Sequence, residues 1–78
     1  MTTISPATPA AIVAALAAAQ VKLPLRMSEQ DTGVILDDDG HDIITIDSNG
    51  KREDDQVDII AMLVVSAINH LAAPEPQT

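Results

Sequence analysis

The sequence predicts one α+β domain in the order α-β-β-β-α, a three-stranded antiparallel β-meander packed by a long C-terminal helix, with a short N-terminal helix beside it. Three observations support this fold. Apolar residues recur at helical spacing in residues 54–73, short apolar runs alternate with polar turns in residues 21–47, and an alanine-rich segment lies near the N-terminus. We expect the domain at residues 9–73, between disordered tails at residues 1–8 and 74–78.

The N-terminal helix has a start signal in the sequence. Thr8 can serve as an N-cap and Pro9 suits the first helical position, so we expect a helix from Pro9 to about Gln20. Alanine favours a helix but buries little area. The larger side chains must therefore supply most of the docking surface, and these are Ile12, Val13 and Leu16.

The middle of the chain contains three expected strands. Residues 21–27 alternate between apolar and polar side chains, which indicates a half-buried strand. Pro24 cannot donate to a ladder, so this strand lies at an edge or is only partly regular. Two further strands are expected at residues 34–36 and 42–47, the latter with isoleucine on both faces. The turn between them, residues 37–40 (DDDG), ends in an Asp-Gly pair, which supplies the positive φ angles of a tight hairpin.

The long helix carries apolar residues on more than one side. Its first turn is acidic, as suits a helix N-terminus, and Pro74 follows its end. A second apolar row lies beside the main one, so we expect the helix to be buried on more than one side. A membrane span is the alternative, but the uninterrupted apolar run is about ten residues, well short of the roughly 20 that a bilayer requires, and has no basic flank. The N-terminal segment also lacks the basic residues of a signal peptide. We expect a cytoplasmic protein without a membrane segment.

The composition favours self-association. A chain of 78 residues buries a small share of its surface, and this one has no Cys, Phe, Trp or Tyr to compensate. Oligomerisation is the usual remaining route to stability at this size. We expect a homodimer whose interface lies on the long helix, at Ile59, Met62, Leu63, Val65 and Ser66.

The charge balance is strongly acidic, with 12 Asp and Glu against 4 Lys and Arg and a formal net charge of −8. Phosphate binding requires the opposite sign, and the aromatic side chains of single-strand binders are absent, so we expect no direct contact with nucleic acid. The partner is instead expected to be basic, or the acids only keep the protein soluble. The candidate partner-binding residues form two groups along the chain. They are Asp37, Asp38, Asp39 and Asp42 at the hairpin and Glu53, Asp54, Asp55 and Asp58 at the helix start.

The residues do not match a known catalytic or metal-binding pattern. An EF-hand loop needs ligands at fixed spacing before and after its glycine, and neither Gly40 nor Gly50 satisfies that spacing. His41 and His70 are far apart in sequence, and the serines have no triad partners or oxyanion motif. We expect a non-enzymatic protein with no metal and no cofactor.

Several of these segments together resemble a widespread type of small phage and prophage protein. They are LPLRM (23–27), Gly33-Val34, LDDDG (36–40), Ile43 to Asp47, Asp54-Asp55 and LVVSAIN (63–69). In such proteins a strand beginning at a Leu-Pro pair leads to a D-x-D-G hairpin and then to a helix of the form L-I-V-x-A-V-N. This chain departs from the pattern at Leu25, where an aromatic residue often follows the proline, and in its alanine-rich extension before Val21. The resemblance implies a phage context and carries over no catalytic residues.

Compact acidic phage proteins are similar in character to anti-CRISPR and other anti-defence inhibitors, many of which bind a nuclease complex and occlude its nucleic-acid surfaces. The leading hypothesis from the sequence is therefore an inhibitor that binds a basic host protein, plausibly a CRISPR effector, through its acidic hairpin and helix start. The alternative is a small structural or dimerisation module that acts through its apolar C-terminal helix.

Overall fold

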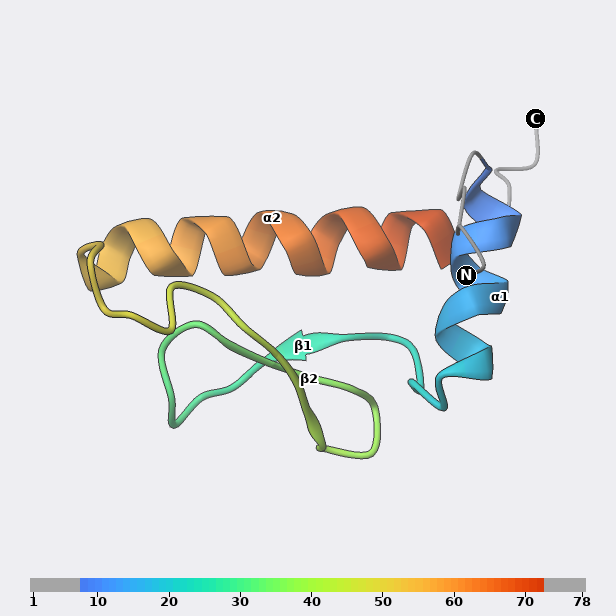
Figure 1. The fold of residues 1–78 in the computed structure, drawn as a ribbon, viewed down its shortest axis with the longest axis horizontal. Helices are drawn as coiled ribbons and strands as arrows, with labels where there is room; N and C mark the ends of the chain where they lie inside the picture. The colour runs from blue at the N-terminus through green and yellow to red at the C-terminus, as the bar shows by residue number, and fades with distance from the viewer. Residues whose placement is uncertain (1–7, 73–78) are drawn as a thin grey trace.

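The computed structural model describes residues 8–72 and contains two helices and three strands in the expected order (Figure 1). The expected tails lie outside the described residues, apart from Thr8, which belongs to the fold as a helix cap. The elements are α1 (Pro9–Ala18), β1 (Arg26–Met27), β2 (Val34–Leu36), β3 (Asp42–Thr45) and α2 (Asp54–Ala72). The α-β-β-β-α prediction is confirmed.

Both ends of α1 are set by local hydrogen bonds. The Thr8 hydroxyl accepts from the backbone N–H of Ala11 at 3.1 Å, which confirms the predicted cap. The helix ends two residues before the expected Gln20, because Gln20 adopts a left-handed conformation with φ of 64°. The N–H groups of Gln20 and Val21 turn back to the carbonyls of Ala17 and Leu16, both at 3.0 Å. This is a Schellman motif, which satisfies the free carbonyls of the last turn.

The strands form one antiparallel sheet in the order β1-β2-β3, and β1 is an edge strand, as Pro24 predicted. The regular part of β1 is far shorter than residues 21–27. The backbone of Leu25 pairs with a side chain of α2 and not with a neighbouring strand. The alternation still holds, since Val21, Leu23, Leu25 and Met27 are at least half-buried while the residues between them are exposed.

A β-bulge in β3 explains why adjacent isoleucines both reach the core. Ile35 pairs with Ile44, but Leu36 pairs with Asp42, so Ile43 has no partner of its own in β2. The extra residue changes the local direction of the strand. Ile43 and Ile44 are both half-buried and pack against the core, and β3 ends at Thr45, two residues earlier than expected.

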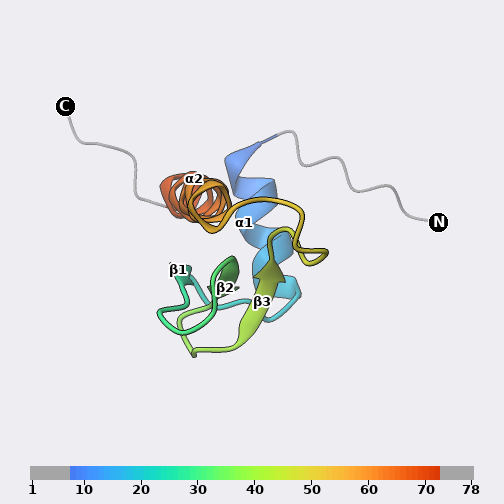
Figure 2. The same ribbon diagram turned by 90° about the vertical axis from the view of Figure 1, so that its left-hand side faces the viewer.

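The core lies between the sheet and α2, which crosses one face of β1 and β2 (Figures 1 and 2). Its buried apolar residues within the described part of the chain are Leu25, Ile35, Val57 and Ala61. The helix α1 packs against α2 near the C-terminal end of α2; its half-buried residues are Ile12, Val13 and Leu16, and none of its ten residues is fully buried. The described chain therefore has a small aliphatic core.

Within one chain, α2 is covered on one side, which contradicts the expectation that it is buried on several. Val57 and Ala61 are its buried residues. On the opposite side Ile59, Met62 and Leu63 are 53%, 50% and 59% exposed. By length and composition alone α2 could cross a membrane, a property that core helices of soluble proteins share.

Candidate functional site

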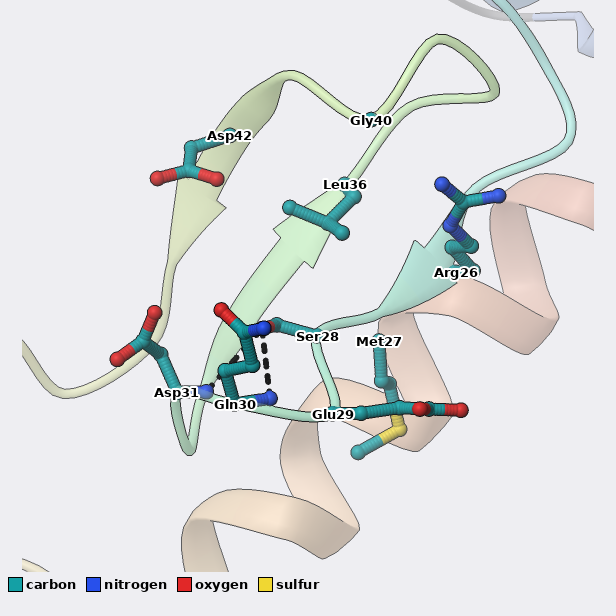
Figure 3. Close-up of a pocket in the computed structure, with 9 residues that line it drawn as sticks. All are labelled: Arg26, Met27, Ser28, Glu29, Gln30, Asp31, Leu36, Gly40 and Asp42. Atoms are coloured by element: carbon teal, nitrogen blue, oxygen red, sulfur yellow. Dashed lines mark hydrogen bonds between the residues drawn. The ribbon is translucent and has the colours of Figure 1, made fainter.

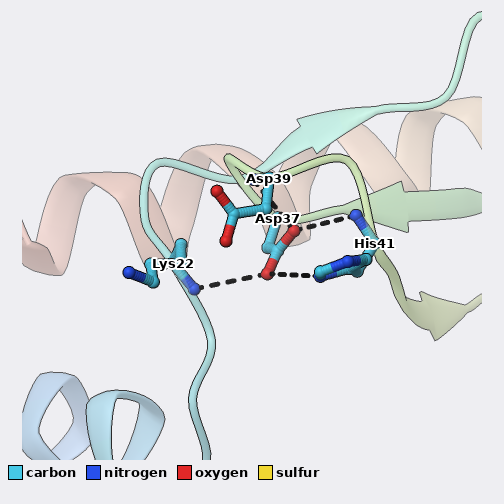
Figure 4. Close-up of polar contacts among 4 residues, drawn as sticks. All are labelled: Lys22, Asp37, Asp39 and His41. Atoms are coloured by element: carbon cyan, nitrogen blue, oxygen red, sulfur yellow. Dashed lines mark hydrogen bonds and ion pairs between the residues drawn. The ribbon is translucent and has the colours of Figure 1, made fainter.

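The acidic hairpin is organised around Asp37, which is 1% exposed and was expected at a partner-binding surface (Figure 4). Its Oδ1 accepts from the backbone N–H groups of Asp39 at 3.1 Å and His41 at 2.9 Å. Its Oδ2 accepts from the backbone N–H of Lys22 at 3.4 Å and lies 3.8 Å from the His41 ring. Asp37 thus serves the turn and does not face a partner, which corrects the prediction for this residue.

The same hydrogen bonds determine the protonation chemistry of this carboxyl. The His41 backbone N–H lowers the pKa of Asp37 below its ordinary 3.8, and the N–H groups of Lys22 and Asp39 act in the same direction, while burial opposes them. Ligand atoms of Asp37, Asp39 and His41 lie within 4.8 Å of one another, a spacing a metal ion could use. Both Asp37 oxygens already accept backbone hydrogen bonds, so this cluster is explained by turn formation.

The turn itself has three residues between paired strand ends. The N–H of Gly40 bonds to the Asp37 carbonyl, and the N–H of Asp37 bonds to the His41 carbonyl, both at 3.0 Å. Gly40 has a φ of 84° and is the one residue of the DDDG turn with a positive φ. The predicted positive φ is confirmed for Gly40 but not for Asp39, so a single left-handed residue closes a three-residue loop.

The two acidic groups lie apart in the described structure: the start of α2 is at one end of the long axis, and the hairpin is at the edge of the sheet, on the side toward α1 (Figure 1). The hairpin is next to the segment that leaves α1, where the Asp38 N–H bonds to the Lys22 carbonyl at 2.8 Å. The other group surrounds the start of α2, at the far end. The exposed acids are Asp38, Asp39 and Asp42 at the hairpin and Glu53, Asp54, Asp55 and Asp58 at the helix. A single convergent array is not formed, because β3 and the loop after it separate the two groups.

The outer side of α2 carries an exposed apolar stripe, which we call the outer stripe and define as Ile59, Met62, Leu63 and Ser66. These are four of the five residues predicted for a dimer interface. The fifth, Val65, is half-buried and packs against the core cluster. Its placement corrects the prediction: Val65 lies about 60° around the helix from Met62 and about 40° from the buried Ala61, on the side that packs against the core.

Asn69 is a structural residue to which the sequence analysis gave no role. Its Oδ1 accepts from the Leu25 N–H at 2.7 Å, and its Nδ2 donates to the Leu25 carbonyl at 2.9 Å. The amide thereby replaces a strand partner for the residue just before β1. The signal in the sequence that could have identified Asn69 was an amide side chain directly after the apolar run of the helix, beside the half-buried Ile68.

A hollow of about 470 Å³ lies on the sheet face opposite α2 (Figure 3). Leu36 forms its floor between its cross-strand neighbours Arg26 and Asp42. At its rim the Ser28 hydroxyl accepts from the N–H groups of Gln30 and Asp31, both at 3.1 Å. Three carboxylates and one guanidinium line this hollow, so its lining is net negative and favours a small cationic or neutral polar group over an anion.

Comparison with protein-family models, curated proteins and solved structures finds no match to this chain.

Proposed function

We propose that this protein is a non-enzymatic interaction module that binds another protein chain through the outer stripe of α2. One observation carries the proposal. Ile59, Met62 and Leu63 are each at least half exposed and adjoin one another on one helix face. A contiguous exposed apolar patch of this kind is typical of an interaction surface, whereas isolated exposed apolar residues are not.

The surroundings of the stripe favour a protein partner over a lipid surface. The exposed acids Asp55 and Asp58 adjoin its N-terminal end, and the chain has a formal net charge of −8. The cytoplasmic leaflet of a membrane is itself negative and repels such a protein. A helix face with apolar anchors three and four residues apart fits the common mode in which one helix packs against another. We propose that it works in the cytoplasm.

The proposal can be tested by photo-crosslinking in cells. A photoreactive phenylalanine analogue placed at Leu63 should yield covalent adducts with another protein chain. Met62→Glu should remove these adducts, because a charge in the contact loses its hydration, whereas Thr32→Glu, at an exposed position outside the outer stripe, should leave them unchanged. Adducts at Leu63 no more abundant than with the analogue at Thr32 would refute the proposal.

The acidic hairpin supports a second candidate function. Asp38, Asp39 and Asp42 are exposed on a turn that buried Asp37 holds by three backbone hydrogen bonds, so the charges are presented with little freedom. We propose, as this second candidate, that the hairpin binds a basic host protein such as a CRISPR effector, in keeping with the resemblance to small phage proteins. Asp38→Lys with Asp39→Lys should then abolish capture of that partner while Met62→Glu preserves it. The opposite pattern would exclude the hairpin.

A further inference from the structure

We infer that the occupant of the outer stripe is a second copy of this chain, whose α2 packs antiparallel to the first about a twofold axis between Met62 and Leu63. This inference rests on the proposed function and names its partner. It follows from the size of the core, the charges at the two ends of the stripe and the order of residues along it.

The small core indicates that the partner is another copy. Four apolar residues are fully buried in the described chain, the aliphatic residues that surround them are only partly buried, and the sequence has no disulfide and no aromatic side chain to add to them. Chains of this size usually need a disulfide, a metal or self-association. Covering Ile59, Met62 and Leu63 with their own copies would enlarge the buried aliphatic surface, and Ser66 would be the one polar side chain of the stripe that is covered with them.

The charges at the ends of the stripe determine the direction of pairing. Exposed Asp55 and Asp58 adjoin its N-terminal end, and exposed His70 lies one turn beyond Ser66 at the other. A parallel pair would bring the acids of both copies together, which costs free energy in a chain already at −8. An antiparallel pair instead places Asp55 near an imidazole, which can donate a hydrogen bond to the carboxylate, and it sets the two helix dipoles antiparallel to each other.

The order of residues along the stripe then determines the register. With the axis between Met62 and Leu63, each of these residues lies beside its own copy in the second chain, about one residue rise away along the helix axis. Ile59 lies opposite Ser66, so a large side chain meets a small one, and Asp55 lies opposite His70. A single register of the two helices therefore brings the apolar residues into contact and also places each Asp55 beside a His70.

Because the chain has no cysteine, single-cysteine variants test this geometry directly. In the antiparallel pair the two Ile59 positions lie about 10 Å apart along the axis at about 1.5 Å per residue, beyond the roughly 7 Å that a disulfide spans between Cα atoms. We therefore expect Met62→Cys to form a disulfide-linked dimer, and a mixture of Ile59→Cys with Ser66→Cys to form a mixed dimer. Ile59→Cys alone, Ser66→Cys alone and the exposed control Thr32→Cys should stay monomeric on reducing-agent-free gels.

Sedimentation of the unmodified chain and a charge exchange complete the test. The wild type should sediment with twice its mass of 8.2 kDa. His70→Glu should weaken the dimer about tenfold, and adding Asp55→Lys should restore it. A monomer at all concentrations, or self-crosslinking of Ile59→Cys and Ser66→Cys each alone, would overturn the inference. A monomer that still gives adducts at Leu63 with a different protein would overturn the inference and preserve the proposed function. A monomer that gives no adducts at Leu63 would overturn the inference and the proposed function together.

Discussion

Two polar side chains, Asn69 and Asp37, satisfy backbone groups that no strand partner reaches. Each spans a large gap in sequence, since Asn69 bonds to Leu25 and Asp37 bonds to Lys22. Buried backbone groups without a partner are costly. These two residues therefore stabilise the segment between α1 and β1, where Pro24 and the short strand leave few ladder bonds.

Replacing Asn69 by alanine should lower the free energy of unfolding by about 2 kcal/mol, because it leaves the Leu25 N–H and C=O unpaired beside the core. Urea denaturation followed by circular dichroism measures the change. Asn49→Ala, the same change at an exposed loop position, should shift the value by less than about 0.5 kcal/mol. Equal effects of the two substitutions would show that the bonds to Leu25 contribute nothing.

Asp37 should make the protein sensitive to acid. Its pKa is lowered in the folded state, chiefly by the His41 N–H, so the unfolded chain takes up the proton first as the pH falls. The stabilisation from Asp37 is complete above the ordinary aspartate pKa of 3.8 and is lost as the pH falls through the lower folded value. Asp37→Asn should reduce stability at pH 7 and flatten its decline below pH 4, whereas Asp38→Asn should do neither. If the free energy of unfolding changed with pH in the same way for wild type and Asp37→Asn, this role of the Asp37 carboxylate would be contradicted.

At the scale of elements, the close approach of a turn to α2 sets the height of the helix above the sheet. Gly33, just before β2, is buried and has a φ of 82°. A Cβ atom there would lie 2.6 Å from Cγ1 of Val57 and 2.9 Å from the Ile46 carbonyl oxygen. Its own carbonyl accepts from the Ile46 N–H at 2.8 Å. The helix and the loop after β3 thus both contact this glycine.

Gly33→Ala should destabilise the fold by about 2–4 kcal/mol, because left-handed strain and steric overlap add. Gly50 separates these two effects, since it has a φ of 70° but open space around its missing Cβ. Gly50→Ala should therefore cost only the strain, about 1–2 kcal/mol. Thermal and urea unfolding of both variants measure the difference. Equal losses would mean that Val57 moves aside without cost.

At the scale of the molecule, the protein combines a small core with a large net charge. Exposed acids lie at the hairpin and at the start of α2; within the described structure Arg52 forms a salt bridge with Asp47, and the His41 ring lies 3.8 Å from Asp37. Repulsion among the remaining acids opposes folding and is screened by salt.

Raising NaCl from about 20 mM to about 500 mM should therefore raise the unfolding midpoint, by about 4–8 °C if screening removes about 1 kcal/mol of repulsion. Asp38→Lys with Asp39→Lys changes the formal net charge from −8 to −4 at exposed positions and should reduce that salt response. Calorimetry at several salt concentrations measures both. A midpoint that falls with salt would show that attractive pairs dominate.

The sequence by itself determined the features that depend on near neighbours. The Thr8 cap, the Gly40 turn, the edge position of the strand after Pro24 and the order of all five elements follow from side chains within a few residues of each feature. Hydrophobic periodicity also identified which residues of α2 are apolar, and these include three of the four residues in the outer stripe.

Only the tertiary structure decided what depends on how the elements are rotated and placed. The rotation of α2 on the sheet turns Val65 inward and leaves Met62 outward, although both belong to the same apolar run. The approach of Lys22 to the hairpin buries Asp37, which the sequence had grouped with exposed acids. Asn69 shortens β1 from 44 positions away. Periodicity and turn signals reach only a few residues along the chain, whereas burial depends on contacts between distant segments.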